Sequence, residues 1–198
     1  MGAALLSVLV LTGCGGISDD ERAQLHTDAL DEGGCEDLLS GPAMGELTGS
    51  QGSFRLTEVG GVDACQALIT KAGSRVTAVR LPASSWAQSQ TLTFQDLLDP
   101  ATSDPEITAL VEKASGAGVS DDEACTLFAA LSEATHPDAG SVVITTFPLG
   151  GLEVASAQAC ADGEFALLNI ETAGSIELTD ALRADLQAAL DEIRPGEL

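Results

Sequence analysis

Two stretches of the chain, 53–82 and 141–171, share one pattern of hydrophobic and polar positions. Each stretch contains three short runs that are rich in apolar and β-branched residues. Glycine-containing turns separate these runs: Gly60-Gly61 and the letters KAGS in the first stretch, and Gly150-Gly151 and the letters ADG in the second. Short runs divided by such turns are typical of hairpins. The sequence therefore predicts two three-stranded antiparallel meanders.

Apolar positions with a helical period predict a helix on each side of the second meander. Ser-Asp-Asp-Glu at 120–123 has the spacing of a capping box, in which serine and glutamate satisfy free backbone N–H groups. The helix that begins there should run to about Ala134, with one apolar face made of Ala124, Leu127, Phe128, Leu131 and Ala134. A longer helix is expected over 178–193, with a stripe made of Leu178, Leu182, Leu186, Leu190 and Ile193.

Helices are also expected around the first meander. The letters Ser-Asp-Asp-Glu occur a first time at 18–21, so a helix should begin near Ser18. After the meander, the segment FQDLLD and then the segment PEITALVEKA read as helical. Asp104 is a suitable N-cap for the second of these, and Pro105 suits its first helical position.

These patterns together predict an α+β fold made of two similar units, at 35–116 and 117–198. Each unit would be a helix, a three-stranded antiparallel meander and a helix. Gly60 and Gly150 are 90 residues apart, and Cys35 and Cys125 are also 90 apart. The match is incomplete, because the cysteines of the two meanders, Cys65 and Cys160, are 95 apart.

The N-terminal residues 2–17 carry no charge, and the run is too short to cross a bilayer as a helix. An apolar core next to small residues is the pattern of an export signal. Leu11-Thr12-Gly13-Cys14 resembles the lipobox of bacterial lipoproteins. The alternative is a buried helix with an incidental cysteine. An export signal starts with Lys or Arg, which Met1-Gly2-Ala3-Ala4 lacks. Either the terminal amine serves alone or translation starts upstream, and we expect the second.

The lipobox resemblance implies that residues 1–13 are removed as a signal peptide and that Cys14 carries acyl chains. Residues 14–34 would then hold the lipidated cysteine, a tether and the first helix. The body of the chain resembles, in its composition, short lipoproteins with paired cysteines and no known function. The implied location is the extracytoplasmic face of the bacterial cell membrane, to which the acyl chains on Cys14 anchor the protein.

Four further cysteines, Cys35, Cys65, Cys125 and Cys160, follow Cys14 in the chain. Their gaps of 30, 60 and 35 residues do not fit the close pairs that bind zinc. An even number of cysteines in an exported protein predicts two disulfides, with three possible pairings. The repeat favours Cys35 with Cys65 and Cys125 with Cys160, so that each bond would join a helix to its own meander.

The charge of the chain limits its partners. It has 31 acidic and 8 basic residues and a net charge of −23, none of it in residues 1–13. This argues against nucleic acid and anionic lipid, which require Lys and Arg. The acidic surface can simply be solvated, or it can attract a basic protein, a cationic ligand or Ca²⁺. One acidic cluster lacks the usual calcium-loop spacing and is therefore not assigned as a metal site: Asp28, Asp31, Glu32, Glu36 and Asp37.

Motifs for catalysis are missing from the sequence. It contains neither H-E-x-x-H nor G-x-S-x-G, and neither Lys71 nor Lys113 completes an S-x-x-K motif or a phosphate-binding loop. His26 lies in an acidic stretch and is expected to be solvated. His136, which precedes Pro137, is expected at a helix end, where a positive ring would favour the helix dipole. The sequence therefore predicts no catalytic residue, no metal and no cofactor.

Trp86, the only tryptophan, lies in the polar segment ASSWAQSQ between a predicted strand and a predicted helix. Its ring can serve as a binding contact, or it can fold back and hide against the sheet edge. On the first interpretation, Trp86 would line a cleft between the two units, and the acidic rim of this cleft would attract a cationic partner.

The functional hypothesis from the sequence is a lipid-anchored, non-enzymatic binding or accessory protein of the cell envelope. Two alternatives remain open. One is a hydrolase of an envelope polymer whose site is assembled from scattered residues. The other is a structural envelope protein that depends on a cation.

Overall fold

A computed structural model describes Cys35, Leu38, Leu39 and the ranges 41–48, 54–59, 62–69, 74–90, 104–116, 118–137 and 139–193. The predicted signal peptide, Cys14, the tether and the first helix lie outside these described residues. So do His26, the acidic cluster at 28–37 and the segment FQDLLD. The predictions made for these parts of the chain stay predictions.

The described helices are α3 (Pro42–Thr48), α4 (Ala83–Ser89), α6 (Pro105–Ser115), α7 (Asp121–Thr135) and α8 (Asp180–Ile193). The described strands are β1 (Phe54–Val59), β2 (Val62–Ile69), β3 (Ser74–Pro82), β4 (Val142–Leu149), β5 (Leu152–Ala161) and β6 (Glu164–Thr172).

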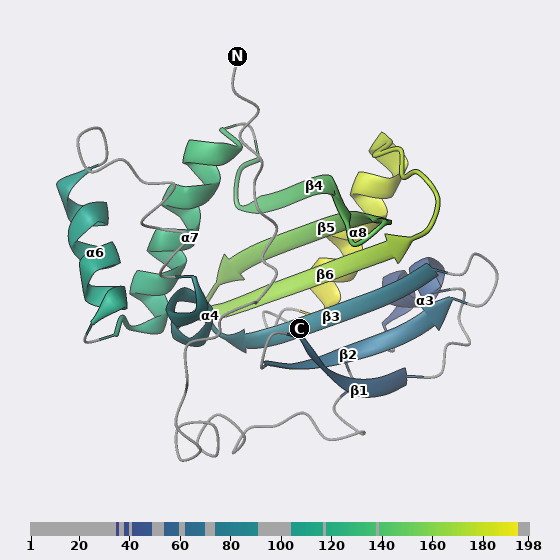
Figure 1. The fold of residues 1–198 in the computed structure, drawn as a ribbon, viewed down its shortest axis with the longest axis horizontal. Coiled ribbons are helices and arrows are strands. Elements are labelled where there is room, and N and C mark those ends of the chain that lie inside the picture. Colours follow the sequence, from purple (N-terminus) through teal and green to yellow (C-terminus); the bar gives the residue numbers. More distant parts are fainter. Residues whose placement is uncertain are drawn as a thin grey trace.

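One six-stranded antiparallel sheet contains all of these strands, in the order β1-β2-β3-β6-β5-β4 (Figure 1). Both predicted meanders are confirmed, because β1-β2-β3 and β4-β5-β6 are neighbours in sequence and in space. The meanders join through their third strands: β3 pairs with β6 and places Thr77 opposite Asn169. The predicted α+β class is therefore the class of the structure.

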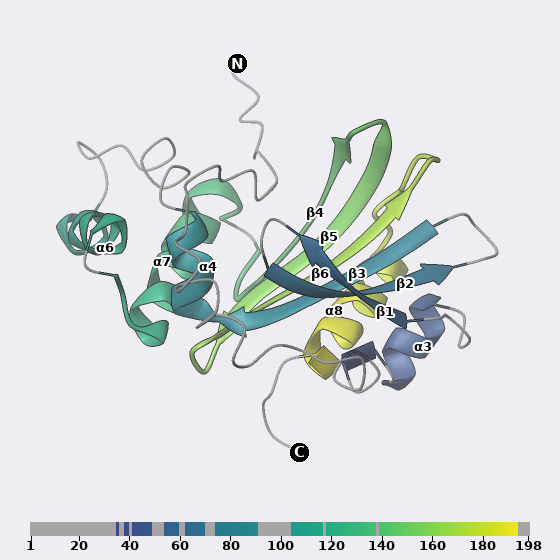
Figure 2. The same ribbon diagram turned by 60° about the horizontal axis from the view of Figure 1, so that its bottom comes forward.

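Helices cover both faces of the sheet, which we call face A and face B. Face A packs against α3, α8 and the segment that contains Cys35, Leu38 and Leu39. Face B packs against α4 and α7, and α6 packs on α7. Figure 2 shows α3 and α8 together beneath the strands, away from the group formed by α4, α6 and α7. Because side chains alternate along a strand, each strand contributes to both cores.

Two helices begin with the local signals that the sequence predicts. At α6, the Asp104 carboxylate accepts a hydrogen bond from the Glu106 N–H, and Pro105 is the first helical residue. At α7, the Ser120 side chain and the Glu123 side chain form both hydrogen bonds of a capping box. Such caps satisfy backbone N–H groups that have no partner within the helix.

Two other helices are capped by carboxylates from distant parts of the chain. Glu192 of α8 accepts hydrogen bonds from the N–H groups of Ala43 (2.8 Å) and Met44 (3.0 Å) at the start of α3. A Cβ at Gly41 would collide with this carboxylate. Asp121 of α7 accepts a hydrogen bond from the Ser84 N–H (2.9 Å) at the start of α4. These contacts fix α3 to α8 and α4 to α7.

The predicted repeat of a whole helix–meander–helix unit is not confirmed. At the 90-residue offset that aligns the β1-β2 hairpin with the β4-β5 hairpin, Cys65 corresponds to Ala155. The cysteine of β5 is instead Cys160, five positions later, and an odd shift moves a side chain to the opposite face of a strand. Cys65 therefore lies in the core of face A, whereas Cys160 packs on the core of face B. The first cysteines of the two units consequently attach to opposite faces of one sheet.

Within the part of the chain that the structure describes, every helix is too short or too polar to cross a membrane.

Candidate functional site

The two disulfides of the structure join the cysteines that the repeat in the sequence favours as partners. Cys35 is bonded to Cys65 and Cys125 to Cys160, each with 5.2 Å between the Cα atoms. The first bond is inaccessible, since Cys35 is 1% and Cys65 0% exposed. Both cysteines of the second bond are only partly buried. The two bonds clamp helical segments onto opposite faces of the sheet.

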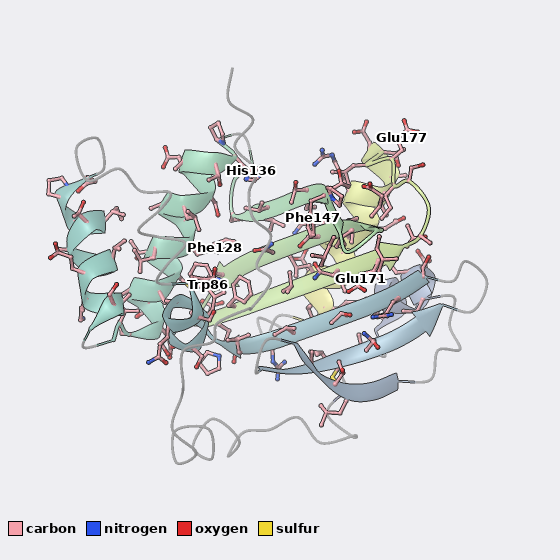
Figure 3. The ribbon with its side chains drawn as sticks, viewed as in Figure 1. Trp86, Phe128, His136, Phe147, Glu171 and Glu177 are labelled. Carbon is pink, nitrogen blue, oxygen red and sulfur yellow. A yellow bond between two sulfur atoms is a disulfide. The ribbon has the colours of Figure 1, made fainter. Side chains whose placement is uncertain are left out.

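Trp86 is a core residue, which corrects its prediction as a binding contact. The polar segment around Trp86 forms α4, and this helix turns the indole inward, so that it is only 2% exposed. The ring stacks on Phe165 of β6 with 5.1 Å between centroids, and meets Phe128 of α7 edge-on at 5.4 Å. Figure 3 shows Trp86 beside Phe128, where the helices meet the sheet. The structure therefore agrees with the other interpretation, in which the Trp86 ring is buried against the sheet.

The predicted cleft between the two units is also absent from the described chain. Eight consecutive residues of β3, Arg75 to Pro82, pair with β6, so the units meet in a continuous strand ladder. A ladder leaves no gap for a ligand, because neighbouring strands lie only about 4.8 Å apart. A partner has to bind elsewhere on the surface.

A row of polar side chains crosses face B at the point where the two meanders meet. The strand register aligns them from β2 to β4: Gln66, Thr77, Asn169, Ser156 and Thr145. Gln66 is 5%, Thr77 2% and Ser156 1% exposed. The Gln66 amide donates to the Thr77 hydroxyl (3.3 Å), whereas the buried Asn169 Oδ1 receives no hydrogen bond within the described structure.

An ion pair lies next to this row on face B, on the side of the row that is farther from α4 and α7. Arg75 Nη1 of β3 lies 3.5 Å from Glu171 Oε2 of β6. The buried Arg75 Nε, like Asn169 Oδ1, has no hydrogen-bond partner among the described residues. Phe147 of β4 completes this row across β5 (Figure 3). We call the five residues Gln66, Thr77, Asn169, Arg75 and Glu171 the polar patch.

Two buried atoms of the polar patch, Arg75 Nε and Asn169 Oδ1, lack a hydrogen-bond partner among the described residues. One free donor and one free acceptor on neighbouring strands fit a group that both donates and accepts, such as water, a hydroxyl or an amide. Buried polar groups without partners cost free energy, so a bound group of this kind would stabilise the patch. Sequence reasoning missed the patch, although its signal is visible: polar residues interrupt the apolar members of face B at alternate positions, as Asn169 does after Phe165 and Leu167.

A hollow of about 180 Å³ lies between α4 and the segment that joins α6 to α7. Its walls are formed by Ser84, Ser85, Gln88, Ala114, Gly118 and Val119. Ligand pockets usually measure about 300–1,000 Å³, so this hollow is small for an organic ligand.

The remaining candidates show no catalytic arrangement in the described structure. His136 is the C-cap of α7, as expected, and its Nδ1 lies 3.1 Å from the Thr135 hydroxyl. Among the described residues, no three His, Cys, Asp or Glu side chains gather closely enough to hold a metal ion. The acidic cluster at 28–37 lies outside the described residues.

One carboxylate has a strongly shifted pKa. The Lys113 ammonium donates to both Glu123 oxygens (2.6 Å each), and the Ser120 N–H donates to Glu123 Oε2 (2.8 Å). These contacts lower the pKa of Glu123 from 4.5 to about 2, and the hydrogen bond from Lys113 has the largest effect. They fasten α6 to the start of α7.

This shift predicts a pH-dependent difference between the protein and its Glu123→Gln variant. A carboxylate whose pKa is lowered on folding stabilises the fold above its unfolded pKa, and this contribution is lost as the pH falls from about 4.5 to about 2. Thermal unfolding should show Glu123→Gln melting below the parent at neutral pH, with the difference closing towards pH 2. A difference that stays constant with pH would contradict this role.

Comparison of the chain with models of known families, with curated proteins and with solved structures finds no match.

Proposed function

We propose that this chain is a lipid-anchored, extracytoplasmic binding or accessory protein without an enzymatic activity. The observation that carries this proposal is the pair of disulfides, Cys35–Cys65 and Cys125–Cys160, which clamp both faces of the sheet. Stable disulfides are typical of exported proteins. Cys14 is the one cysteine left over, and it stands at the end of a sequence that resembles a lipobox.

Charge supports a cationic partner. The excess of 31 acidic over 8 basic residues attracts basic proteins and cationic ligands, and it repels nucleic acid. Part of the small basic complement is itself paired with carboxylates: Arg75 with Glu171, Arg80 with Glu164 and Lys113 with Glu123.

We expect that Cys14 is acylated and that residues 1–13 are removed. Stable anchoring takes more than one acyl chain, because a single chain holds a protein only marginally. Mass spectrometry of the protein from membranes should find a mature N-terminus at Cys14 that carries lipid mass. Cys14→Ala should leave the chain uncleaved or release it from the membrane. Native protein that keeps Met1 and has no lipid mass would contradict the anchor.

The binding role is tested by affinity capture from envelope extract at low and at high salt. A cationic partner held by the acidic surface should be lost as salt rises, because salt screens exposed charges. Hydrolysis of envelope polymer by the purified protein, abolished in a His136→Ala variant, would instead favour the enzyme alternative.

A further inference from the structure

Strand β4 forms an edge of the sheet that carries no charge. The residues between Asp138 and Glu153 contain no Asp, Glu, Lys or Arg, and all of β4 lies within this segment. The other edge strand, β1, has Arg55 and Glu58 in its sequence. Charged residues on an edge strand prevent it from pairing with another chain. Of the two edge strands, only β1 therefore has charged residues in its sequence.

The hairpin geometry shows which backbone groups of β4 face outward. The turn between β4 and β5 consists of Gly150 and Gly151, both with positive φ (60° and 85°), as a two-residue hairpin turn requires. In such a hairpin Leu149 and Leu152 form a hydrogen-bonded pair, and hydrogen-bonded and outward-facing residues then alternate along the strand. The outward-facing residues are accordingly Val142, Ile144, Thr146 and Pro148.

A side-chain contact agrees with this assignment. The Arg183 guanidinium of α8 donates to the Ile144 carbonyl (3.4 Å), so this oxygen is accessible from outside the sheet. Pro148 has no N–H group, and proline at such a position limits strand pairing. The segment of β4 that can accept another strand is therefore Val142 to Thr146.

We propose that a second copy of this chain pairs with β4, antiparallel and centred on Ile144. Val142 then lies opposite Thr146 of the second copy, and the two Ile144 residues face each other across the two-fold axis. The three outward-facing residues of each copy form hydrogen bonds, and the ladder ends where Pro148 lacks its donor. The sheets of the two molecules become continuous.

A second copy is the occupant that fits because its own β4 is equally uncharged. The pairing brings no charged residues of the two strands opposite each other, although both chains carry −23 overall and each Arg183 guanidinium has to leave the Ile144 carbonyl. The chain already joins its two meanders in this way, through antiparallel pairing of β3 with β6. Repulsion between the acidic surfaces keeps the dimer weak and makes it stronger as salt rises.

Hydrogen exchange tests this proposal directly. It uses the chain from residue 14 onward with the substitution Cys14→Ser, which includes every described residue. The proposed anchor enters this experiment only through the protein concentration that is chosen. Tethering two molecules gives an effective concentration on the order of 1 mM. At that concentration the amides of Val142, Ile144 and Thr146 should become protected, while at high dilution they exchange freely. Sedimentation should show a dimer whose fraction falls as salt is lowered from about 0.15 M to about 0.01 M.

Two variants separate this ladder from other contacts. Thr146→Pro removes an outward-facing N–H that β5 does not use, so it should abolish the dimer and leave the fold intact. Arg183→Gln frees the Ile144 carbonyl and should strengthen association. A chain that stays monomeric at about 1 mM would overturn the proposal. So would a dimer that survives in Thr146→Pro or that protects other amides instead of these three. Lipid mass at Cys14 is measured separately, so the anchor and the dimer can fail independently.

Discussion

Replacing Trp86 with alanine should lower the free energy of unfolding by about 3–5 kcal/mol, the usual cost of removing a large buried aromatic side chain. The indole is 2% exposed and touches both Phe128 and Phe165, with ring centroids 5.4 and 5.1 Å away. Its removal leaves a cavity in the core of face B, at the point where α4, α7 and β6 meet. Urea denaturation measures this loss.

The matched control is Leu149→Ala at the exposed end of β4. Leu149 is 36% exposed, so its truncation should change stability by no more than about 0.5 kcal/mol. Trp86→Phe should give a smaller loss than Trp86→Ala, because it keeps an aromatic ring against Phe165. If Trp86→Ala were as stable as the parent, the ring would not belong to the core. Its role as a surface contact would then have to be reconsidered.

The elements that could be predicted from the sequence are those specified by neighbouring residues. The capping box at Ser120 and Glu123 and the Asp104-Pro105 start are formed as expected, because each acts within one turn of helix. The long C-terminal helix was predicted over 178–193 and begins at Asp180. The strands were visible because glycine turns divide them.

What the sequence does not specify locally is how distant elements meet. The pairing of β3 with β6 joins residues about 90 positions apart, and no local pattern states that two meanders share one sheet. The polar patch depends on that pairing, since Thr77 and Asn169 become neighbours only through it. Both interpretations of Trp86 stayed open because its segment is polar, and its burial depends on Phe128 and Phe165 from other elements.

The disulfides could be predicted in part: their pairing was visible in the sequence, whereas the face of the sheet on which each one lies was not. The repeat pointed to the correct partners, because each cysteine of a helix lies before its own meander. The five-residue difference in the position of the second cysteine determines which face of the sheet each disulfide lies on. This becomes visible only once the strands are aligned. Cys35–Cys65 therefore belongs to face A and Cys125–Cys160 to face B.

We expect the two disulfides to differ in their reduction although they contribute similar stability. They close loops of 30 and 35 residues, which corresponds to about 3.5–4 kcal/mol each in the chain-entropy model. Thiol–disulfide exchange requires the attacking thiolate to reach a sulfur. Cys125 and Cys160 are partly exposed, whereas Cys35 and Cys65 are buried. Mild reductant should therefore open Cys125–Cys160 in the folded protein and leave Cys35–Cys65 closed until the protein unfolds.

Alkylation after graded reduction, followed by non-reducing peptide mapping, measures the order. The paired substitutions Cys125→Ala with Cys160→Ala, and Cys35→Ala with Cys65→Ala, provide the energetic comparison. The second pair should cost more, because it removes sulfur atoms from a closely packed core as well as the cross-link. Simultaneous reduction of both bonds in the folded state would contradict the difference in burial. A peptide that links Cys65 to Cys160 would contradict the assignment of the bonds to opposite faces, since those two side chains lie on opposite sides of the sheet.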